Sequence, residues 1–227
     1  MNGLRVAIVE EHEMRVLVAC EFSGRVRDAF AKRGHDAWSC DLLPTETPGQ
    51  HIQGDVLSVL GDGWDLMVAH PPCTYLANSG VRWFHTKDNV YNERRLENML
   101  EGTKFFKVLL SCNILKIVVE NPVMHRYAAH VIGQKPDQYI QPYWFGDSVQ
   151  KKTGLWLKNL PLLKPTNIVD RGMVYVDPRG NKHGGAHTMQ AKKAYSPLML
   201  LPKSEERWKI RSRTFQGIAS AMAEQWG

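Results

Sequence analysis

One cysteine stands directly after a double proline at the end of an apolar run. Residues 65–69 read Asp-Leu-Met-Val-Ala, and His70-Pro71-Pro72-Cys73 follows them. The run predicts a buried parallel strand, which the prolines must end because proline cannot donate to a sheet ladder. In α/β proteins, ligands and catalytic groups lie at such strand ends. Cys73 is therefore a candidate nucleophile, and an ordinary buried thiol after a turn is the alternative reading.

Four acidic residues occupy similar positions, each at or just after the end of a predicted strand. They are Glu21, Asp41, Asp55 and Glu120. Buried carboxylates are costly without partners, so core packing does not readily explain this pattern. Because parallel strands all point the same way, we expect these acids and Cys73 to line one edge of a sheet, where a crevice would lie.

At these strand ends the chain resembles the DNA (cytosine-5) methyltransferases, and most of all their short, divergent bacteriophage-type members. Pro71-Pro72-Cys73, with Ser79-Gly80 downstream, resembles the nucleophile loop of that family, and Glu120-Asn121-Pro122 resembles its Glu-Asn-Val motif. The resemblance covers residues 15–157 and the C-terminal helix. It implies transfer of a methyl group from S-adenosylmethionine to carbon 5 of cytosine, through a covalent Cys73 adduct at carbon 6.

The resemblance also implies roles for the neighbouring residues. Glu120 would hold N3 and the 4-amino group of the base, and Asn121 would fix the Cys73 loop. If burial raises the pKa of Glu120, the protonated carboxyl would donate to N3. Since a free thiol has a pKa of about 8.5, Cys73 would need a nearby positive charge or helix terminus to activate it.

The Gln-x-Arg-x-Arg motif of the family corresponds to residues 150–154, which read Gln-Lys-Lys-Thr-Gly. Lys152 takes the place of the first arginine and is assigned to the catalytic group with Cys73, Glu120 and Asn121. Gly154 stands where the second arginine would contact the cytosine carbonyl. The resemblance therefore requires another cation in that role.

Three short motifs resemble the donor site of the family. Phe22-Ser23-Gly24 resembles its Phe-x-Gly loop, and Asp41 stands at the place of the acid that meets the donor ribose. Gly54-Asp55-Val56 resembles the element whose acid meets the adenine amino group. The resemblance also assigns Pro71 to the site, with S-adenosylmethionine as the cofactor.

Charge and composition favour a polyanionic partner. The 227 residues carry a net charge of +6, and basic residues interleaved with aromatic ones are dense between 150 and 213. This suits phosphate neutralisation and base stacking, and a solvated charged surface is the alternative. Since the target carbon is inaccessible in a duplex, we expect double-stranded DNA with a flipped cytosine, under a loop at 74–95 that closes over it. The expected DNA contacts are Arg82, Gln150, Lys151, Arg171, Arg179, Lys182, Lys192 and Lys193.

Alternating strands and helices predict an α/β fold, a Rossmann-like class I S-adenosylmethionine-dependent methyltransferase with a mostly parallel central sheet and a small recognition insertion. Strands are expected at 15–20, 36–40, 51–53, 65–69, 115–119, 138–142 and 155–157, and helices at 25–33, 93–112 and 205–226. The expected divisions are an N-terminal extension (1–14), a catalytic core (15–157), a target-recognition or loop region (158–204) and a C-terminal helix that returns to the core (205–227).

Other classes of protein are disfavoured. The four cysteines form no CxxC pair and have no histidine at finger spacing, so neither a metal site nor a disulfide framework is expected. The reduced cysteines favour a cytoplasmic location, in the host cytoplasm if the protein is viral. The sequence has no apolar stretch long enough to span a bilayer, and its N-terminus lacks the pattern of a signal peptide.

Three alternatives stay open. Arg25 and Arg27 follow the donor loop where the family has glycines, and a cation there could welcome a carboxylated donor that transfers a carboxymethyl-type group. The departure at Gly154 and the missing Asn near Ile218 instead fit a non-catalytic methylase relic that binds DNA. RNA is an alternative substrate because basic loops alone do not distinguish RNA from DNA.

Overall fold

The centre of the chain is a seven-stranded sheet with the strand order β3-β2-β1-β4-β5-β7-β6. The computed structural model describes residues 12–85, 90–204 and 206–227. Among these, β7 runs antiparallel to both of its neighbours, and the other neighbouring strands of this sheet run parallel. The strands are β1 (Arg15–Ala19), β2 (Asp36–Asp41), β3 (His51–Gln53), β4 (Leu66–Ala69), β5 (Lys116–Pro122), β6 (Gln138–Ile140) and β7 (Thr153–Lys158).

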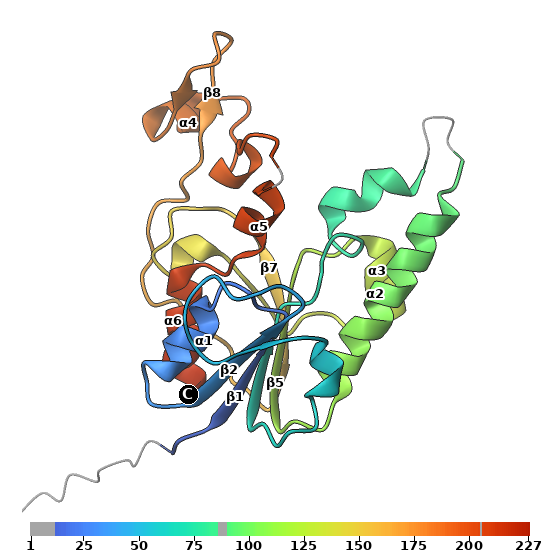
Figure 1. Cartoon of the computed structure of the whole chain (residues 1–227). Coiled ribbons are helices and arrows are strands. Elements are labelled where there is room, and N and C mark those ends of the chain that lie inside the picture. The colour runs from blue at the N-terminus through green and yellow to red at the C-terminus, as the bar shows by residue number, and fades with distance from the viewer. Residues whose placement is uncertain (1–11, 86–89, 205) are drawn as a thin grey trace, which may run out of the picture.

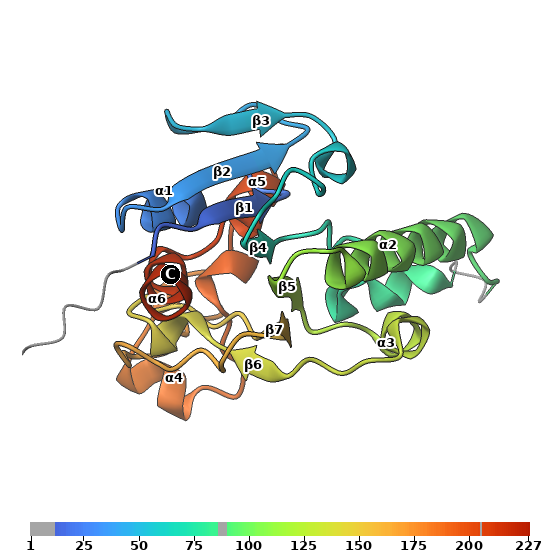
Figure 2. The ribbon, with the colours of Figure 1, turned by 90° about the horizontal axis from the view of Figure 1, so that it is seen from below.

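Helices cover both faces of this sheet. Figure 2, in which the strands are seen from below, shows α1 (Arg25–Ala31) and α6 (Gln216–Trp226) on one face, and α2 (Glu93–Ser111) and α3 (Arg126–Ile132) on the other. Side chains of β1 alternate between two cores, with Val16 and Val18 facing α1 and α6, and Leu17 and Ala19 facing α2 and α3. This confirms the predicted α/β class with a mostly parallel, Rossmann-like sheet.

The sheet changes direction between β1 and β4. From β1 the chain proceeds outwards through β2 and β3, and it then returns to lay β4 and β5 on the opposite side of β1. In an open parallel sheet, the carboxyl ends of the strands on either side of such a reversal form a crevice that binds ligands. The segments 20–24, after β1, and 70–73, after β4, therefore lie at the position where a binding site is expected.

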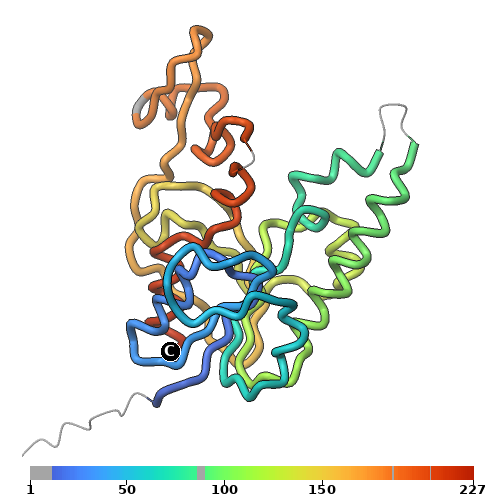
Figure 3. Tube along the Cα trace, viewed as in Figure 1, coloured from blue at the N-terminus to red at the C-terminus, as the bar shows by residue number. Residues whose placement is uncertain are grey.

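Two arms rise beyond the carboxyl ends of the strands (Figures 1 and 3). One holds the 3-10 helix η2 (Asn78–Phe84) and the first part of α2. The other lies between β7 and α6, and holds β8 (Tyr175–Val176), β9 (Lys182–His183), α4 (Ala186–Gln190), η4 (Pro197–Met199) and α5 (Arg207–Ser212). Two further 3-10 helices are η1 (Val56–Ser58) and η3 (Pro142–Trp144).

Several boundaries differ from the predictions. The C-terminal helix is divided into two helices, α5 and α6, and residues 213–215 between them are not helical. The Asp147 side chain caps the first turn of α6 by accepting a hydrogen bond from the Gly217 N–H at 2.9 Å. The helices α3 and α4 were not predicted. Met14, assigned to the N-terminal extension, is 7% exposed and belongs to the core with α1 and α6. Residues 1–11 of that extension, and 86–89 of the expected closing loop, lie outside the described residues. None of the described helices has the length and apolarity needed to cross a membrane.

Candidate active site

Cys73 and Glu120 lie at the same end of two neighbouring strands. In the β4–β5 ladder, Ala69 pairs with Val119, so His70 and Glu120 are the next residues of each strand. Cys73 follows three residues later and is half-buried. The carboxylate of Glu120 is close enough to influence the pKa of the Cys73 thiol. The structure thus brings the candidate nucleophile and the candidate base-holding acid together.

Glu120 is surrounded by groups that stabilise its charge. His70 Nδ1 lies 2.7 Å from Glu120 Oε2, and the two side chains are only 8% and 14% exposed. Thr153 donates a further hydrogen bond, and Lys151 adds a positive charge. His70, Glu120, Lys151 and Thr153 line one narrow cavity, which α6 closes with Ile218 and Met222.

The ionisation of Glu120 differs from the expectation. Burial alone would raise the pKa of Glu120, but hydrogen bonds from His70 and Thr153 and the charge of Lys151 outweigh burial and lower the pKa below its ordinary value. This direction favours the carboxylate form of Glu120 over the protonated form that donation to N3 would need.

The Cys73 thiol is not activated in this resting state. Burial raises the pKa of Cys73, and Glu120 raises it further, while Lys151 and Arg211 only partly oppose these effects. The expected positive charges are present, but they do not outweigh burial. The pKa of Cys73 is therefore above that of a free thiol, which favours the protonated form.

Lys151, rather than Lys152, is the lysine of the site. Successive side chains of a strand point to opposite faces, so Lys151 and Thr153 share the face of Glu120. Lys152 points away and lies over the ring of Tyr139, with its ammonium 4.3 Å from the ring centre. The structure therefore brings Lys151, and not the predicted Lys152, to the side of Glu120. Gln150 is half-buried just before these lysines.

The Cys73 loop is fixed by groups other than the Asn121 side chain. Asn121 is fully buried and its amide donates only to the neighbouring carbonyl of Pro122, at 2.6 Å. The loop is held by backbone bonds, including Asn78 N–H to the Val123 carbonyl at 2.8 Å. The ring of His125 adds a contact of 2.8 Å between Nε2 and the Tyr75 carbonyl. The expected role of Asn121 thus belongs to the segment that follows it.

Two acids of the expected donor site lie near each other at the ends of β2 and β3. Asp41 ends β2 and is half-buried, and burial is the main cause that raises its pKa. Asp55 is exposed and caps η1 through Leu57 N–H at 3.0 Å, as an ordinary turn residue would. Both carboxylates raise the pKa values of Cys20 and Cys40, so the four groups form one cluster beside the end of β1. Pro71 is buried at the end of the neighbouring strand.

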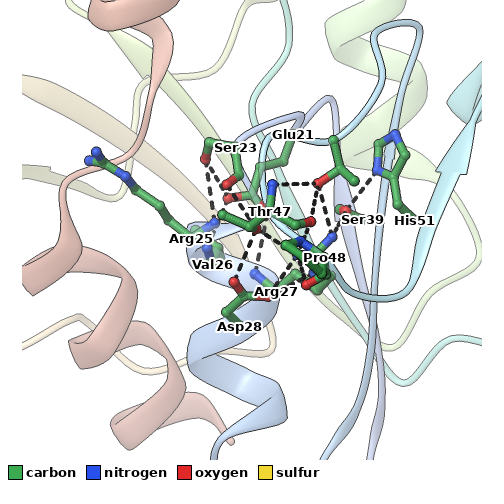
Figure 4. A network of polar contacts seen from close by, with 11 residues as sticks. Glu21, Ser23, Arg25, Val26, Arg27, Asp28, Ser39, Thr47, Pro48 and His51 are labelled. Atoms are coloured by element: carbon green, nitrogen blue, oxygen red, sulfur yellow. Dashed lines mark hydrogen bonds and ion pairs between the residues drawn. The ribbon is translucent and has the colours of Figure 1, made fainter.

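The side chains of the Phe22-Ser23-Gly24 loop are buried, and Figure 4 shows Ser23 within a network of polar contacts. Phe22 and Ser23 are 7% and 3% exposed, and the Ser23 hydroxyl donates to Glu21, whose carboxylate also accepts the Val26 N–H at 2.8 Å. Glu21 thus caps α1 rather than facing the crevice. The side chains of this loop are therefore used internally, which leaves its backbone for a donor molecule.

Arg27 faces the protein interior. Its guanidinium is 1% exposed and donates to Thr47 Oγ1 at 2.8 Å, to the Pro48 carbonyl at 3.2 Å, and to further groups of the segment 39–48. Arg25 donates instead to the Thr214 carbonyl at 2.8 Å. Arg27 is therefore committed to the protein interior, whereas Arg25 is half-buried and keeps N–H groups beyond the one bound to Thr214. The carboxylated donor stays a prediction that depends on Arg25 alone.

The expected DNA contacts lie mainly on the two arms. Arg82, in η2, lies over Trp83 at 4.8 Å, and this tryptophan is 56% exposed. Arg171, Arg179, Lys182, Lys192 and Lys193 are exposed on the opposite arm. Arg207, Trp208 and Arg211 belong to the basic and aromatic region predicted at 150–213 but were not among the expected DNA contacts. With Ser204 they line a cavity of about 590 Å³. The charge of Arg211 also acts on the Cys73 thiol, so α5 is the part of this arm that reaches the candidate nucleophile.

Among the described residues, the acidic, histidine and cysteine side chains form no group of three that could hold a metal ion.

Comparisons with known proteins add a distant structural likeness. No protein-family model matches the chain, and no curated protein matches its sequence. One of the solved structures that it resembles is an E. coli protein described as a candidate DNA modification methyltransferase encoded within a prophage. The two share 13% sequence identity with a TM-score of 0.44, over 70% of this chain and 52% of the other, so the chain spans about half the length of that protein. A likeness of this size carries no functional argument, which must come from the residues of this chain.

Proposed function

We propose that the protein is an S-adenosylmethionine-dependent methyltransferase that modifies carbon 5 of cytosine in DNA. The observation that carries this proposal is the meeting of Cys73, Glu120 and Lys151 at the carboxyl edge of a parallel sheet, at its point of reversal. A half-buried thiol, a carboxylate and a cation are the groups that addition to a pyrimidine ring requires. Cys73 and Glu120 also hold their places in two motifs that resemble the family.

Each group has a distinct task in the reaction. The Cys73 sulfur forms a bond to carbon 6, and the electrons of the ring double bond move towards N3, which is protonated. Carbon 5 is then nucleophilic and would take the methyl group as the bond between that group and the donor sulfur breaks, with a neutral thioether as the leaving group. Loss of the carbon 5 proton restores the double bond and expels the Cys73 thiolate. Glu120 accepts the 4-amino hydrogen bond, and Lys151 is placed to stabilise the thiolate and to supply the cation that Gly154 lacks.

The donor site fits part of S-adenosylmethionine, which when bound supplies an electrophilic methyl group. Asp41 and Asp55 lie together at the ends of β2 and β3, where ribose and adenine hydroxyl and amino groups need acceptors. Arg27 and Thr47 fill the space against Gly24, so the amino-acid end of the donor has no room there. We therefore place that end on the other side of the loop, towards Pro71 and Cys73.

DNA is the proposed substrate because both arms carry cations beside exposed aromatic rings. Arg82 with Trp83 stands on one arm, and Arg207 with Trp208 on the other. Phosphate neutralisation and base stacking need this combination. Since Cys73 lies at the edge of the sheet beneath the arms, the target cytosine must leave its duplex to reach the sulfur.

A mechanism-based trap tests the proposal. The protein is incubated with labelled S-adenosylmethionine and a random-sequence duplex whose cytosines are replaced by 5-fluorocytosine, and the covalent complexes are resolved under denaturing conditions. We expect a labelled complex that Cys73→Ala abolishes. Cys112→Ser is the matched control, because this half-buried thiol lies at the end of α2.

Modified nucleosides from ordinary DNA complete the test. We expect 5-methylcytosine by mass spectrometry after digestion. Equal methyl transfer by Cys73→Ala, or methylation of an exocyclic amino group, would refute the covalent mechanism. Binding of DNA without any transfer would identify a non-catalytic relic, and methylated RNA in a parallel incubation would correct the substrate.

A further inference from the structure

The histidine that precedes the Pro-Pro-Cys segment is bound to the base-holding acid. The backbone N–H of His70 donates to the Ala19 carbonyl at 2.9 Å, which extends the ladder of β4 and fixes the residue at the rim. Its Nδ1 lies 2.7 Å from Glu120 Oε2, and its side chain is 8% exposed. The register of β4 and β5 therefore places His70 directly beside Glu120.

The second ring nitrogen distinguishes His70 from a structural histidine. Nε2 of His70 is buried and has no hydrogen-bond partner in the described part of the chain, although His70 lines the cavity with Glu120 and Lys151. His125 shows the contrast, because it accepts the Ala128 N–H at its Nδ1 and contacts the Tyr75 carbonyl through Nε2. A buried polar atom left unpaired costs free energy and calls for a functional explanation.

The proposed reaction creates a need that Glu120 cannot meet alone. N3 must gain a proton as sulfur bonds to carbon 6, yet the pKa of Glu120 is lowered, against the effect of burial, by His70, Lys151 and Thr153. A carboxylate accepts hydrogen bonds and has no proton to give. The proton must therefore come from a neighbour, and the neighbour in contact is an imidazole, which ordinarily titrates near neutral pH.

We propose that His70 is a positioning residue that stores the proton which Glu120 lends to N3 of the target cytosine. This rests on the proposed function. As the Cys73 sulfur bonds to carbon 6, the Nδ1 proton of a protonated His70 passes through the Glu120 carboxylate to N3, which leaves a neutral imidazole and restores the carboxylate. When the Cys73 thiolate departs, N3 returns its proton along the same path, so the pair is unchanged over the cycle.

The surroundings of the pair determine the sign of the pH dependence. The charged or titratable groups near it are Cys73 after β4, Lys151 before β7 and, beyond Cys73, Arg211 on α5. The α6 side contributes Ile218 and Met222, which are apolar. Lys151 disfavours a proton on Glu120. Loss of His70 would remove one cause that lowers the pKa of Glu120, but the pair would then hold no stored proton for N3, so adduct formation would fail sooner as the pH rises.

The pH profile of adduct formation tests this role. Rate constants are measured between pH 5.5 and 9 with the 5-fluorocytosine duplex and S-adenosylmethionine, for the wild type, His70→Asn, Glu120→Gln and the double variant. Asparagine keeps an N–H towards Glu120 but stores no proton. We expect His70→Asn to match the wild type within about threefold at pH 5.5 and to fall at least about tenfold below it at pH 8, the effect of a pKa difference of one unit or more. In the Glu120→Gln background, His70→Asn should cause no further change in the rate constant of adduct formation at any pH.

The outcomes separate this inference from the proposed function. A His70→Asn profile parallel to that of the wild type, lowered equally at every pH, would show a purely structural histidine while the methyltransferase stands. The absence of any adduct with the wild type would refute both proposals. If His70→Asn does not fold, His70→Gln is measured in its place over the same pH range, and a profile parallel to that of the wild type again overturns the stored proton.

Discussion

Arg27 provides the sharpest test of the packing beside the donor loop. Its guanidinium donates to the Thr47 hydroxyl and carbonyl, to the Pro48 carbonyl and to the Ser39 hydroxyl, at 2.8 to 3.2 Å. It also contacts Asp28, which is 36% exposed. We predict that Arg27→Met, which keeps the bulk of the stem and removes the donors, destabilises the protein.

The magnitude follows from the burial of these groups. Removing one partner from a buried charged network costs about 3–5 kcal/mol, because the carbonyls left behind lose their donors. The cost lies near the lower end here, because threonine and serine hydroxyls can rotate and Asp28 can reach water. A chain of this length should then lose about 10 °C in Tm. Arg27→Lys keeps the charge but loses the forked geometry of the guanidinium, so its stability should lie between those of the wild type and Arg27→Met.

Urea unfolding followed by tryptophan fluorescence measures the change, and Arg25→Met is the matched control. Arg25 is half-buried and makes a single bond to the Thr214 carbonyl, so its loss should cost about 1 kcal/mol or less. The reasoning is refuted if Arg27→Met is as stable as Arg25→Met but alters the preference between S-adenosylmethionine and its carboxylated form in calorimetry. That result would show a guanidinium that meets the donor.

Three further predictions follow from the geometry. Lys151→Ala should slow adduct formation with 5-fluorocytosine DNA by about tenfold or more, as expected for one lost nearby charge, whereas Lys152→Ala should stay within about threefold. Gly24→Ala, at φ 72° against Thr47 and Arg27, should cost about 1–3 kcal/mol more in urea unfolding than Gly34→Ala, at φ 87° in open space. Burial, with Asp41 and Asp55, raises the pKa of Cys40 to about 11. The free energy of unfolding should therefore fall as the pH rises from about 8.5, the thiol pKa of the unfolded chain. In urea unfolding, Cys40→Ser should show a smaller fall over the same pH range.

The sheet could be predicted because its strands carry strong local signals. Residues 16–19, 66–69 and 117–119 are continuous apolar runs, as strands covered on both faces require. The helix α3 was missed because its start lacks the usual capping residues. His125 caps it, with Nδ1 accepting the Ala128 N–H at 3.1 Å, and only Gly133 at its end was a readable signal.

The break between α5 and α6 depends on contacts that no local pattern contains. The intervening residues include neither glycine nor proline. Arg213 forms a bidentate ion pair with Glu46, with N–O distances of 2.6 and 2.7 Å. The Asp147 carboxylate caps α6 by accepting a hydrogen bond from the Gly217 N–H. The partners lie 167 and 70 residues away in the chain. Periodicity alone therefore joined two helices that tertiary contacts separate.

The site was predictable in its residue types and less so in its register. His70 could have been found, because aligning the apolar runs 65–69 and 115–119 as parallel neighbours already sets it beside Glu120. The lysines were harder, since a shift of one residue in a strand exchanges its two faces. The chain fixes that register by pairing Asn121 with Gly154 and Pro122 with Thr153. Thr153 therefore lies on the same face of the sheet as Glu120, and so does Lys151, two residues earlier. Lys152, which the motif spacing indicates, lies on the other face against Tyr139. In the proposed reaction the cation is therefore Lys151, one position before the residue that the motif spacing indicates. Motif spacing gives only the distance along the sequence, whereas the strand register determines which side chains share a face.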